Sequence, residues 1–293
     1  MIAIMEECYE RAYAKINIGL QILGRRSDGY HEIETIFQQI DLYDEIIIQK
    51  TDHHGIELWS NDARLPLGES NLCVQAAKLI RQHSGRNDGV LIRLYKHIPL
   101  AAGLGGGSSD AAAVLRGLSR LWRLDLSLDR FHELAKELGA DVPFFLYGGT
   151  ALGTGIGDQI RPIELPFNFF CVLVYPNIEI SSRWAFSNYN FSLTKTKKSI
   201  KLFHLFFKGM TISDLRKVVR NDLEEVVLRR YPLLGEIKQM LYDRGAFFAS
   251  MSGSGSTIYG LFDNYTDAVA VERSGFMPYQ IIVAMPMITT THL

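Results

Sequence analysis

The segment from Gly103 to Ser109 carries the residues best suited to chemistry in this chain. It holds glycines at positions 103, 105, 106 and 107, then two serines, and an alanine-rich segment with high helix propensity follows. Glycine leaves no Cβ in the way of a ligand, and the first N–H groups of a helix lack partners within the helix. Because the helix dipole also favours negative charge there, the segment predicts a phosphate site in a nucleotide-handling enzyme.

The loop differs from two common phosphate-binding patterns. The P-loop pattern requires a Gly-Lys pair, which this sequence does not contain. The dinucleotide pattern G-x-G-x-x-G fails because position 108 is Ser. A loop that only packs closely would use the same glycines, and Ser108, Ser109 and Asp110 are ordinary first-turn helix residues. This segment alone therefore leaves both a phosphate site and a packing loop open.

Composition limits the classes of protein to which the chain can belong. Its 293 residues are 47% hydrophobic and carry a net charge of −1. This length favours two domains with a substantial core, and the near-neutral charge provides no general attraction for nucleic acid or anionic membrane. No stretch approaches the roughly 20 apolar residues that a membrane-spanning helix needs. We therefore expect no nucleic-acid partner and no membrane partner.

The termini and cysteines indicate a cytoplasmic protein. Glu6, Glu7 and Glu10 make the N-terminus acidic, which is unlike a secretory signal or a transit peptide. The three cysteines lie far apart without a C-x-x-C pair, so we expect reduced thiols. The sequence contains no His/Cys cluster of the kind that would predict a structural metal. The sequence leaves open whether the protein is a monomer or a homodimer.

Hydrophobic patterns predict the elements that position the loop. Alternation of polar and apolar residues predicts strands at 10–24, 32–39, 45–50 and 90–95, and apolar runs predict strands at 169–175 and 258–262. Amphipathic patterns with capping residues predict helices at 71–83, with Ser70 as cap, at about 108–121, from Ser127 or Asp129 to about 139, and at 236–244.

The second half of the chain begins with a change in composition near Pro162–Pro166. We place a domain boundary there, between residues 1–164 and 165–293. The segment 195–210 mixes lysines with phenylalanines. It favours a helix with a solvated lysine face and a core-facing aromatic face over a membrane or partner contact.

Three motifs in order resemble those of the GHMP kinases, which include galactokinase, homoserine kinase and mevalonate kinase. Residues Pro99–Ala112 match P-x-x-x-G-L-G-G-G-S-S-x-A-A, Met251–Thr257 resembles the third motif, and Ala14–Asn17 occupies the place of the first. The resemblance implies an α+β fold of two domains. The N-terminal domain would be ribosomal S5 domain 2-like and the C-terminal domain ferredoxin-like, with ATP and the acceptor meeting in the cleft between them.

Further segments are similar to one branch of that superfamily. They are Ala14–Leu20, Arg26–Thr35, Asp41–Asp44, Leu138–Phe145 and Asn221–Glu224. Enzymes of this branch use ATP to phosphorylate the tertiary 2-hydroxyl of CDP-methylerythritol (4-diphosphocytidyl-2-C-methyl-D-erythritol) in the non-mevalonate isoprenoid pathway. The resemblance weakens between residues 187 and 215. Alternatives are a kinase of the homoserine or mevalonate type, or an inactive ligand-binding protein of the same fold.

The resemblance implies that Asp141 is the catalytic base and Lys15 the catalytic cation. Asp141 lies between a predicted helix end and Pro143, in an apolar setting that would raise its pKa. An inward-pointing Lys15 would polarise the hydroxyl and keep Asp141 ionised. The residues alone favour a different interpretation, in which Asp141 is an N-cap or turn aspartate and Lys15 is a solvent-facing lysine of a strand.

The resemblance also implies binding sites for the two substrates. ATP would lie on Gly103, Leu104, Gly105, Gly106, Gly107, Ser108 and Ser109, with its nucleoside near Asn71, Leu72 and Lys96. Mg²⁺ should accompany ATP, and either Ser109 or Asp110 could contact it. For the acceptor, Tyr30 would stack on cytosine and His31 would bind the base edge. Phe186, with Trp184 as its rival, would be the second face of that stack, and Asn17 would bind hydroxyls.

Overall fold

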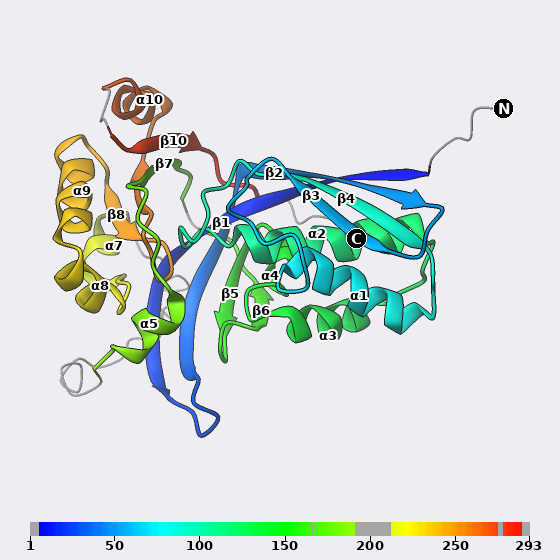
Figure 1. Cartoon of the computed structure of the whole chain (residues 1–293). Coiled ribbons are helices and arrows are strands. Elements are labelled where there is room, and N and C mark those ends of the chain that lie inside the picture. Colours follow the sequence, from blue (N-terminus) through cyan, green and yellow to red (C-terminus); the bar gives the residue numbers. More distant parts are fainter. Residues whose placement is uncertain (1–5, 166, 191–211, 275–277, 289–293) are drawn as a thin grey trace.

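Two antiparallel-rich sheets and the helices around them form the protein (Figure 1). The computed structural model describes residues 6–165, 167–190, 212–274 and 278–288. The predicted helix at 195–210 lies outside these residues. Among the described helices, none has the length and apolar character that crossing a membrane requires.

The first sheet is built on two long strands, β1 (Glu7–Arg25) and β2 (His31–Thr51), which pair along their whole length. The other edge of β2 pairs with β5 (Thr150–Thr154) and with β4 (Gly89–Tyr95), and β3 (Ile56–Ser60) and β6 (Gln159–Pro162) complete the sheet. The prediction of two separate strands within residues 32–50 is wrong. No Gly or Pro interrupts residues 31–51, and pairing with β1 keeps the chain extended.

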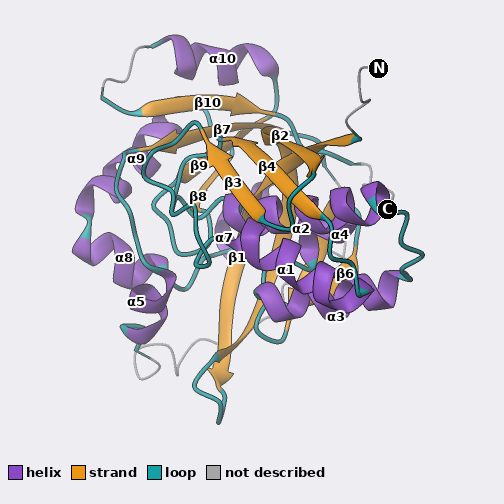
Figure 2. Ribbon diagram, turned by 45° about the vertical axis from the view of Figure 1, so that its right-hand side comes forward, coloured by secondary structure: helices purple, strands orange, loops and turns teal. Residues whose placement is uncertain are grey.

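Four helices lie against one face of this sheet (Figure 2). They are α1 (Leu72–Ser84), α2 (Gly106–Leu121), α3 (Leu128–Leu138) and α4 (Phe144–Tyr147). The alanines of α2 are fully buried, because a helix packed this closely on a sheet has room only for small side chains. Asn71 caps α1 in place of the predicted Ser70, since its side chain accepts from the Cys73 N–H. The α2 helix starts at Gly106, two residues before the predicted Ser108.

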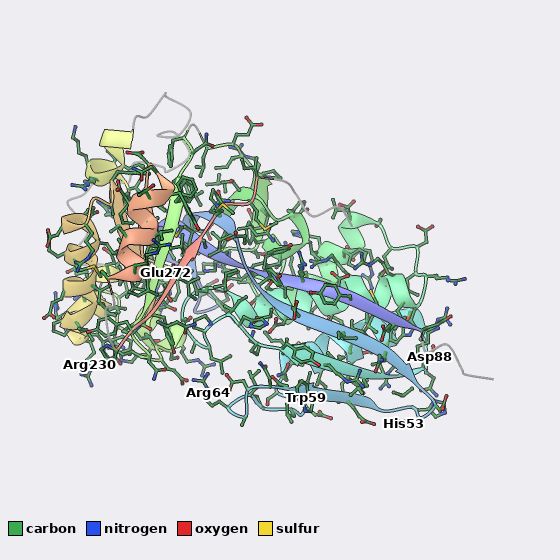
Figure 3. The ribbon with its side chains drawn as sticks, turned by 90° about the horizontal axis from the view of Figure 1, so that it is seen from above. His53, Trp59, Arg64, Asp88, Arg230 and Glu272 are labelled. Carbon is green, nitrogen blue, oxygen red and sulfur yellow. The ribbon has the colours of Figure 1, made fainter. Side chains whose placement is uncertain are left out.

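The second sheet has the order β10-β7-β9-β8, with all neighbours antiparallel. Its strands are β7 (Phe170–Tyr175), β8 (Phe248–Met251), β9 (Ile258–Phe262) and β10 (Gln280–Ala284). The accompanying helices are α5 (Ser182–Ser187), α7 (Ile212–Val218), α8 (Glu224–Arg230), α9 (Pro232–Asp243) and α10 (Tyr265–Arg273). In the view from above, Arg230 and Glu272 of this half lie well away from Trp59 of β3 (Figure 3).

Alternate residues of β7 join two different cores. Cys171 and Leu173 pack with Ile16 and Ile18 of β1, whereas Val172 and Val174 pack with residues of α8 and α9. The shared core holds β1 against the second sheet, so the middle of β1 lies where the two halves meet. The division at residues 164 and 165 stays a prediction, although the first sheet ends at Pro162 and the second begins at Phe170.

Candidate active site

A pocket of about 930 Å³ lies where the halves meet. Its lining comes from β1, the start of β2, the glycine loop, the segment before α4, the helix α5 and the loop after β8. Segments from both halves of the chain therefore converge on one cavity, as expected for a site that brings two substrates together.

The glycine loop and the loop after β8 hold each other in place. The Ser252 hydroxyl donates to the Gly103 carbonyl over 2.8 Å, and the Thr257 N–H donates to the Ala102 carbonyl over 3.1 Å. Gly103 has φ +78°, and a Cβ there would lie 2.1 Å from the Ser252 carbonyl oxygen. Glycine is therefore required at Gly103 both by backbone conformation and by the approach of the second loop.

The N-terminus of α2 opens directly onto the pocket. Gly105 precedes the helix with φ +72°, and Gly105, Gly106, Gly107 and Ser108 all line the cavity. Of the two serines, Ser109 is buried and does not belong to that lining. Because free N–H groups and the helix dipole meet at this point, the geometry suits an anionic ligand of the size of a phosphate chain.

Lys15 and Asp141 face each other across this pocket. The Lys15 Nζ lies 3.6 Å from an Asp141 carboxylate oxygen, and their side chains are 4% and 35% exposed. Lys15 thus points inward, and the alternative of a solvent-facing lysine is wrong. Burial lowers the pKa of the Lys15 ammonium, and the Asp141 carboxylate opposes that shift. The apolar neighbours of Asp141 in the sequence predict a buried side chain, but its side chain is 35% exposed.

Asn17 contacts Lys15 on the floor of the pocket. Its Oδ1 accepts a hydrogen bond from the Lys15 Nζ over 2.5 Å, and its amide nitrogen donates to Thr35. The ring of Phe37 lies 5.6 Å from the same ammonium. An acceptor oxygen, a carboxylate and an aromatic face therefore all surround one buried ammonium, and each of them opposes the loss of its charge that burial favours.

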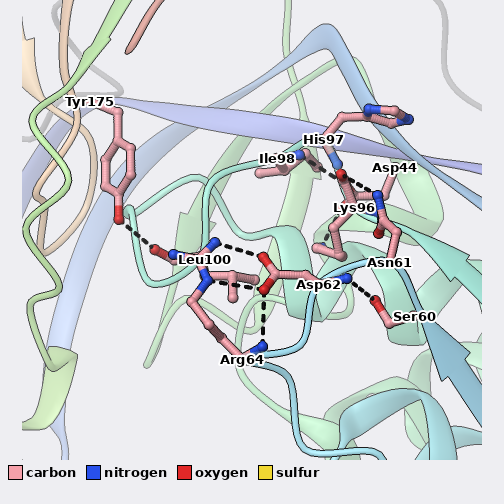
Figure 4. Close-up of polar contacts among 10 residues, drawn as sticks. All are labelled: Asp44, Ser60, Asn61, Asp62, Arg64, Lys96, His97, Ile98, Leu100 and Tyr175. Carbon is pink, nitrogen blue, oxygen red and sulfur yellow. Dashed lines mark hydrogen bonds and ion pairs between the residues drawn. The ribbon is translucent and has the colours of Figure 1, made fainter. Parts of the chain in front are cut away.

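Lys96 lies against the glycine loop at Gly106, and Figure 4 shows it beside Asp44. Its Nζ is 2.7 Å from Asp110 and also forms an ion pair with Asp44, whose other oxygen accepts from the His97 and Ile98 N–H groups. Burial acts to lower the pKa of Lys96, but the two carboxylates outweigh it and raise that pKa. Burial also raises the pKa of Asp110 to about 8. This cluster ties α2 to β2 and to the segment after β4.

The cluster bears on two expectations from the sequence. Lys96 belongs to the pocket lining, yet its ammonium is committed to Asp44 and Asp110. Asp110 is buried and paired with that lysine, so its carboxylate does not face the pocket as a metal ligand would. Leu72 lines the pocket, whereas the Asn71 side chain caps α1 and donates to the Pro66 carbonyl.

Aromatic residues from the start of β2 and from α5 also line the pocket. Tyr30 is 60% exposed, and His31 stacks on Phe186 with ring centroids 5.4 Å apart. Burial lowers the pKa of His31, with a smaller contribution from Arg25. Phe186 lines the pocket, whereas its rival Trp184 packs edge-on against Tyr231. The geometry favours Phe186 over Trp184 as a ring that a ligand could meet.

Sequence reasoning missed several residues that the fold brings to the site. Arg183 lines the pocket and has no hydrogen bond or ion pair within the described part of the chain. Ser182 of α5 and Ser254 of the loop after β8 also line it, and their hydroxyls bond to each other at 2.7 Å within the second half of the chain. Thr35 lies behind Asn17 and is fully buried. The sequence indicates the motif Met251–Thr257, but only the fold shows that its Ser254 side chain contacts α5.

Comparison with known proteins gives consistent results. The chain matches the family models for the GHMP kinases N terminal domain over residues 71–149 and GHMP kinases C terminal over residues 199–275. A 4-diphosphocytidyl-2-C-methyl-D-erythritol kinase of Prosthecochloris aestuarii is 43% identical, over 96% of this chain and 100% of its own. One of Caldanaerobacter subterraneus is 40% identical, over 93% and 94%.

Solved structures agree with the sequence matches. A crystal structure of 4-(cytidine 5'-diphospho)-2C-methyl-D-erythritol kinase has a TM-score of 0.77 at 31% identity, covering 94% of this chain and 99% of its own. A mevalonate kinase of Methanococcus jannaschii has a TM-score of 0.75 at 17% identity, covering 98% and 100%, and shows a likeness of fold alone. The predicted two-domain α+β fold with two sheets is thereby confirmed.

Proposed function

Because this chain belongs to the 4-diphosphocytidyl-2-C-methyl-D-erythritol kinases of the GHMP superfamily, we propose that the described pocket is where it transfers phosphate from ATP to CDP-methylerythritol. The enzyme is an ATP-dependent kinase of the methylerythritol phosphate route to isoprenoids. The observation that carries the assignment of the site is the buried Lys15 beside Asp141, in a cavity that also receives the glycine loop.

The chemistry begins with the tertiary 2-hydroxyl of the acceptor near Asp141. Its oxygen attacks the γ-phosphorus of ATP, the new O–P bond forms, and the bond from the γ-phosphorus to the β,γ-bridging oxygen breaks, so that ADP leaves. Asp141 takes the hydroxyl proton on its carboxylate. The Lys15 ammonium, 3.6 Å from that carboxylate, stabilises negative charge that develops on the oxygens. Positioning and charge stabilisation are the main demands of phosphoryl transfer, and this site supplies both.

ATP is proposed to bind with its phosphates over the N-terminus of α2. The backbone N–H groups of Gly105, Gly106 and Gly107 are the donors there. Leu72 and the chain at Lys96 flank the same side of the cavity and suit the nucleoside. Since the Lys96 ammonium is held by Asp44 and Asp110, its side chain supports the loop and leaves phosphate contacts to the backbone.

Mg²⁺ is proposed to arrive with ATP rather than as a resident metal. Among the described residues, no cluster of His, Cys, Asp or Glu could hold a metal ion. Mg²⁺ keeps several waters and binds nucleotide phosphates with few protein ligands, so such a cluster is not required. The Ser108 hydroxyl, on the pocket side of the glycine loop, is the oxygen ligand that fits this role. When bound, the ion would neutralise charge on the β and γ oxygens.

The aromatic residues of the pocket are proposed to bind the cytidine end of the acceptor. Tyr30 offers an exposed ring, and His31 and Phe186 offer an imidazole and a second ring on the same side of the pocket. Arg183 is a cation at the pocket without a protein partner in the described residues, and its guanidinium suits the diphosphate of the acceptor. Small alcohols such as homoserine or mevalonate have no base to stack, so these rings favour the nucleotide-linked acceptor.

The location of the enzyme is proposed to be cytoplasmic. Its cysteines, Cys8, Cys73 and Cys171, are all free thiols, and two of them are buried. Burial raises the pKa of Cys73 and Cys171, so both stay protonated and unreactive. This pattern suits a reducing compartment.

The proposal is tested by incubating the enzyme with ATP, Mg²⁺ and a panel of alcohols. The panel contains CDP-methylerythritol, methylerythritol 4-phosphate, homoserine and mevalonate, and ADP release is measured for each. We expect turnover with CDP-methylerythritol alone. Turnover with homoserine or mevalonate would favour a kinase of the homoserine or mevalonate type. ATP binding without turnover of any acceptor would favour an inactive ligand-binding protein.

A further inference from the structure

A chain of hydrogen bonds runs from the catalytic lysine into the interior of the first half. The Lys15 Nζ donates to the Asn17 Oδ1, and the Asn17 Nδ2 donates to the Thr35 hydroxyl oxygen over 2.8 Å. The Thr35 hydroxyl in turn donates to the Gly19 carbonyl over 2.7 Å. Thr35 is fully buried on β2 and lies on the far side of Asn17 from the pocket.

The direction of each bond in this chain is fixed by chemistry. The Gly19 carbonyl can only accept, so the single hydrogen of the Thr35 hydroxyl must point to it. The hydroxyl oxygen then has only lone pairs to offer to Asn17, and it must receive a hydrogen from the Nδ2. An Asn amide carries its acceptor opposite its donors, so Oδ1 must face Lys15.

We infer that Thr35 is a positioning residue, which fixes the Asn17 amide so that its oxygen holds the Lys15 ammonium beside Asp141. This inference rests on the proposed function, in which Lys15 is the catalytic cation. The backbone of Asn17 is held as well, since its carbonyl accepts from the Tyr259 hydroxyl and its N–H donates to Ser252. Because these bonds hold the main chain of Asn17, its amide group can still rotate at the end of the side chain. The hydrogen bond to Thr35 prevents that rotation.

Loss of the Thr35 hydroxyl would allow the Asn17 amide to turn over. The Nδ2 hydrogens would then face the Lys15 ammonium, and two donors would oppose each other in a buried site. Within residues 6–165, 167–190, 212–274 and 278–288, the titratable group around that ammonium is Asp141, from the segment before α4. The neighbours from β2, the glycine loop and the loop after β8 are Phe37, Gly105 and Gly253, none of which titrates. The ammonium would thus lose an acceptor and keep a single counter-ion.

The test compares Thr35→Val, which removes the hydroxyl at nearly constant volume, with Thr35→Ser, which retains it. We expect kcat with CDP-methylerythritol to fall about tenfold or more in Thr35→Val, which is the scale of one hydrogen bond to a charged group. The KM for ATP should stay within about twofold, because Thr35 lies away from the glycine loop. Thr35→Ser should restore most of the lost kcat.

The pH profile of kcat separates positioning from a loss of packing. In Thr35→Val the alkaline limb should move to lower pH, because an ammonium without its acceptor loses its proton more easily. A merely structural effect would lower activity without moving that limb. Thr150→Val is the matched control. The Thr150 hydroxyl donates to Gln38, which lies on β2 as Thr35 does, and it forms no hydrogen bond with Asn17 in the described part of the chain. It should change neither kcat nor the profile.

Each outcome of the experiment is decisive for one of the two proposals. If the wild-type enzyme does not phosphorylate CDP-methylerythritol, the proposed function fails. If the wild type is active and the pH profile of Thr35→Val matches that of the wild type, whether or not kcat falls, only the role of Thr35 is overturned. Melting curves establish that the variants are folded, and Thr35→Ala repeats the test in case the valine variant does not fold.

Discussion

Replacement of Lys15 by Met separates the contribution of the charge to catalysis from its contribution to stability. Met has a similar length and fills the same space without the ammonium. At 3.6 Å from Asp141, the Coulomb attraction at an effective dielectric of 20 is about 5 kcal/mol. Asp141 is 35% exposed, so solvent reduces this attraction, and the attraction is lost once Asp141 takes the proton. The contribution of Lys15 to catalysis is therefore the stabilisation of charge on the reacting oxygens, which is roughly 3–4 kcal/mol for one well-placed donor.

That energy predicts a fall in kcat of about 10²–10³-fold in Lys15→Met. The folded protein should not become less stable, since burial outweighs Asp141 and lowers the pKa of Lys15. A lysine with a lowered pKa is disfavoured in its charged form by the fold, so the melting temperature of Lys15→Met should equal or exceed that of the wild type at neutral pH.

A coupled assay of ADP release and a thermal melt provide the two measurements. The KM for ATP should change little, because in the proposed site Lys15 faces the reacting hydroxyl and the phosphates lie on the backbone of the glycine loop. Turnover of Lys15→Met within tenfold of wild type would refute the role of the ammonium in the chemistry. A large fall in melting temperature together with lost activity would show that Lys15 acts through the fold.

Three further predictions concern the glycine loop, the aromatic residues of the pocket and the buried cluster. Gly103→Ala should raise the KM for ATP and lower the unfolding free energy by about 1–3 kcal/mol, because a Cβ there meets the Ser252 carbonyl. Gly24→Ala, which has open space around it, should change neither quantity. Enzyme kinetics measure the first effect and denaturant melts the second. Tyr30→Ala should raise the KM for CDP-methylerythritol about tenfold and leave the KM for ATP unchanged, and equal changes would contradict the stacking role. Because burial raises the pKa of Asp110 from 3.8 to about 8, this carboxyl makes the fold less stable as pH rises through that window, by at most about 1.4 kcal/mol per pH unit. Asp110→Asn removes that dependence, so the unfolding free energy of the variant should rise relative to that of the wild type between pH 6 and pH 8. Melts of both proteins at the two pH values measure this difference. A difference that stays the same at both pH values would contradict the prediction.

Much of the site could be predicted because its residues lie in short local motifs. The four glycines and the helix after them indicated an anion site, and the order of three motifs indicated the fold. Local pattern also placed β9 at residues 258–262, where the structure has it. Lys15 and Asp141 were both expected from the resemblance, although 126 positions of sequence separate them. Whether they could meet depended on tertiary packing, which brings them to 3.6 Å.

What the sequence could not predict depends on contacts between distant elements. The joining of residues 31–51 into one strand follows from pairing with β1, a long-range contact that local pattern does not report. Lys96 could not be assigned to Asp44 and Asp110, because 52 positions separate it from the first and the burial of all three depends on α2. The role of Thr35 depends on a Gly19 carbonyl exposed by a shift in strand register between Asn17 and Leu20.

We propose that Asp141, held beside Lys15, accepts the proton of the acceptor hydroxyl during phosphoryl transfer. The most direct measurement is single-turnover transfer from ATP to CDP-methylerythritol, followed by ³¹P NMR of the product, in the wild type, Asp141→Asn and Asp28→Asn. Asp28 also lines the pocket but pairs with Arg26 at its rim, so it controls for a lost carboxylate. We expect the 2-phosphate to form in the wild type and Asp28→Asn, and transfer to slow by about 10²–10⁴-fold in Asp141→Asn while ATP still binds. Transfer at a near wild-type rate in Asp141→Asn would contradict the account.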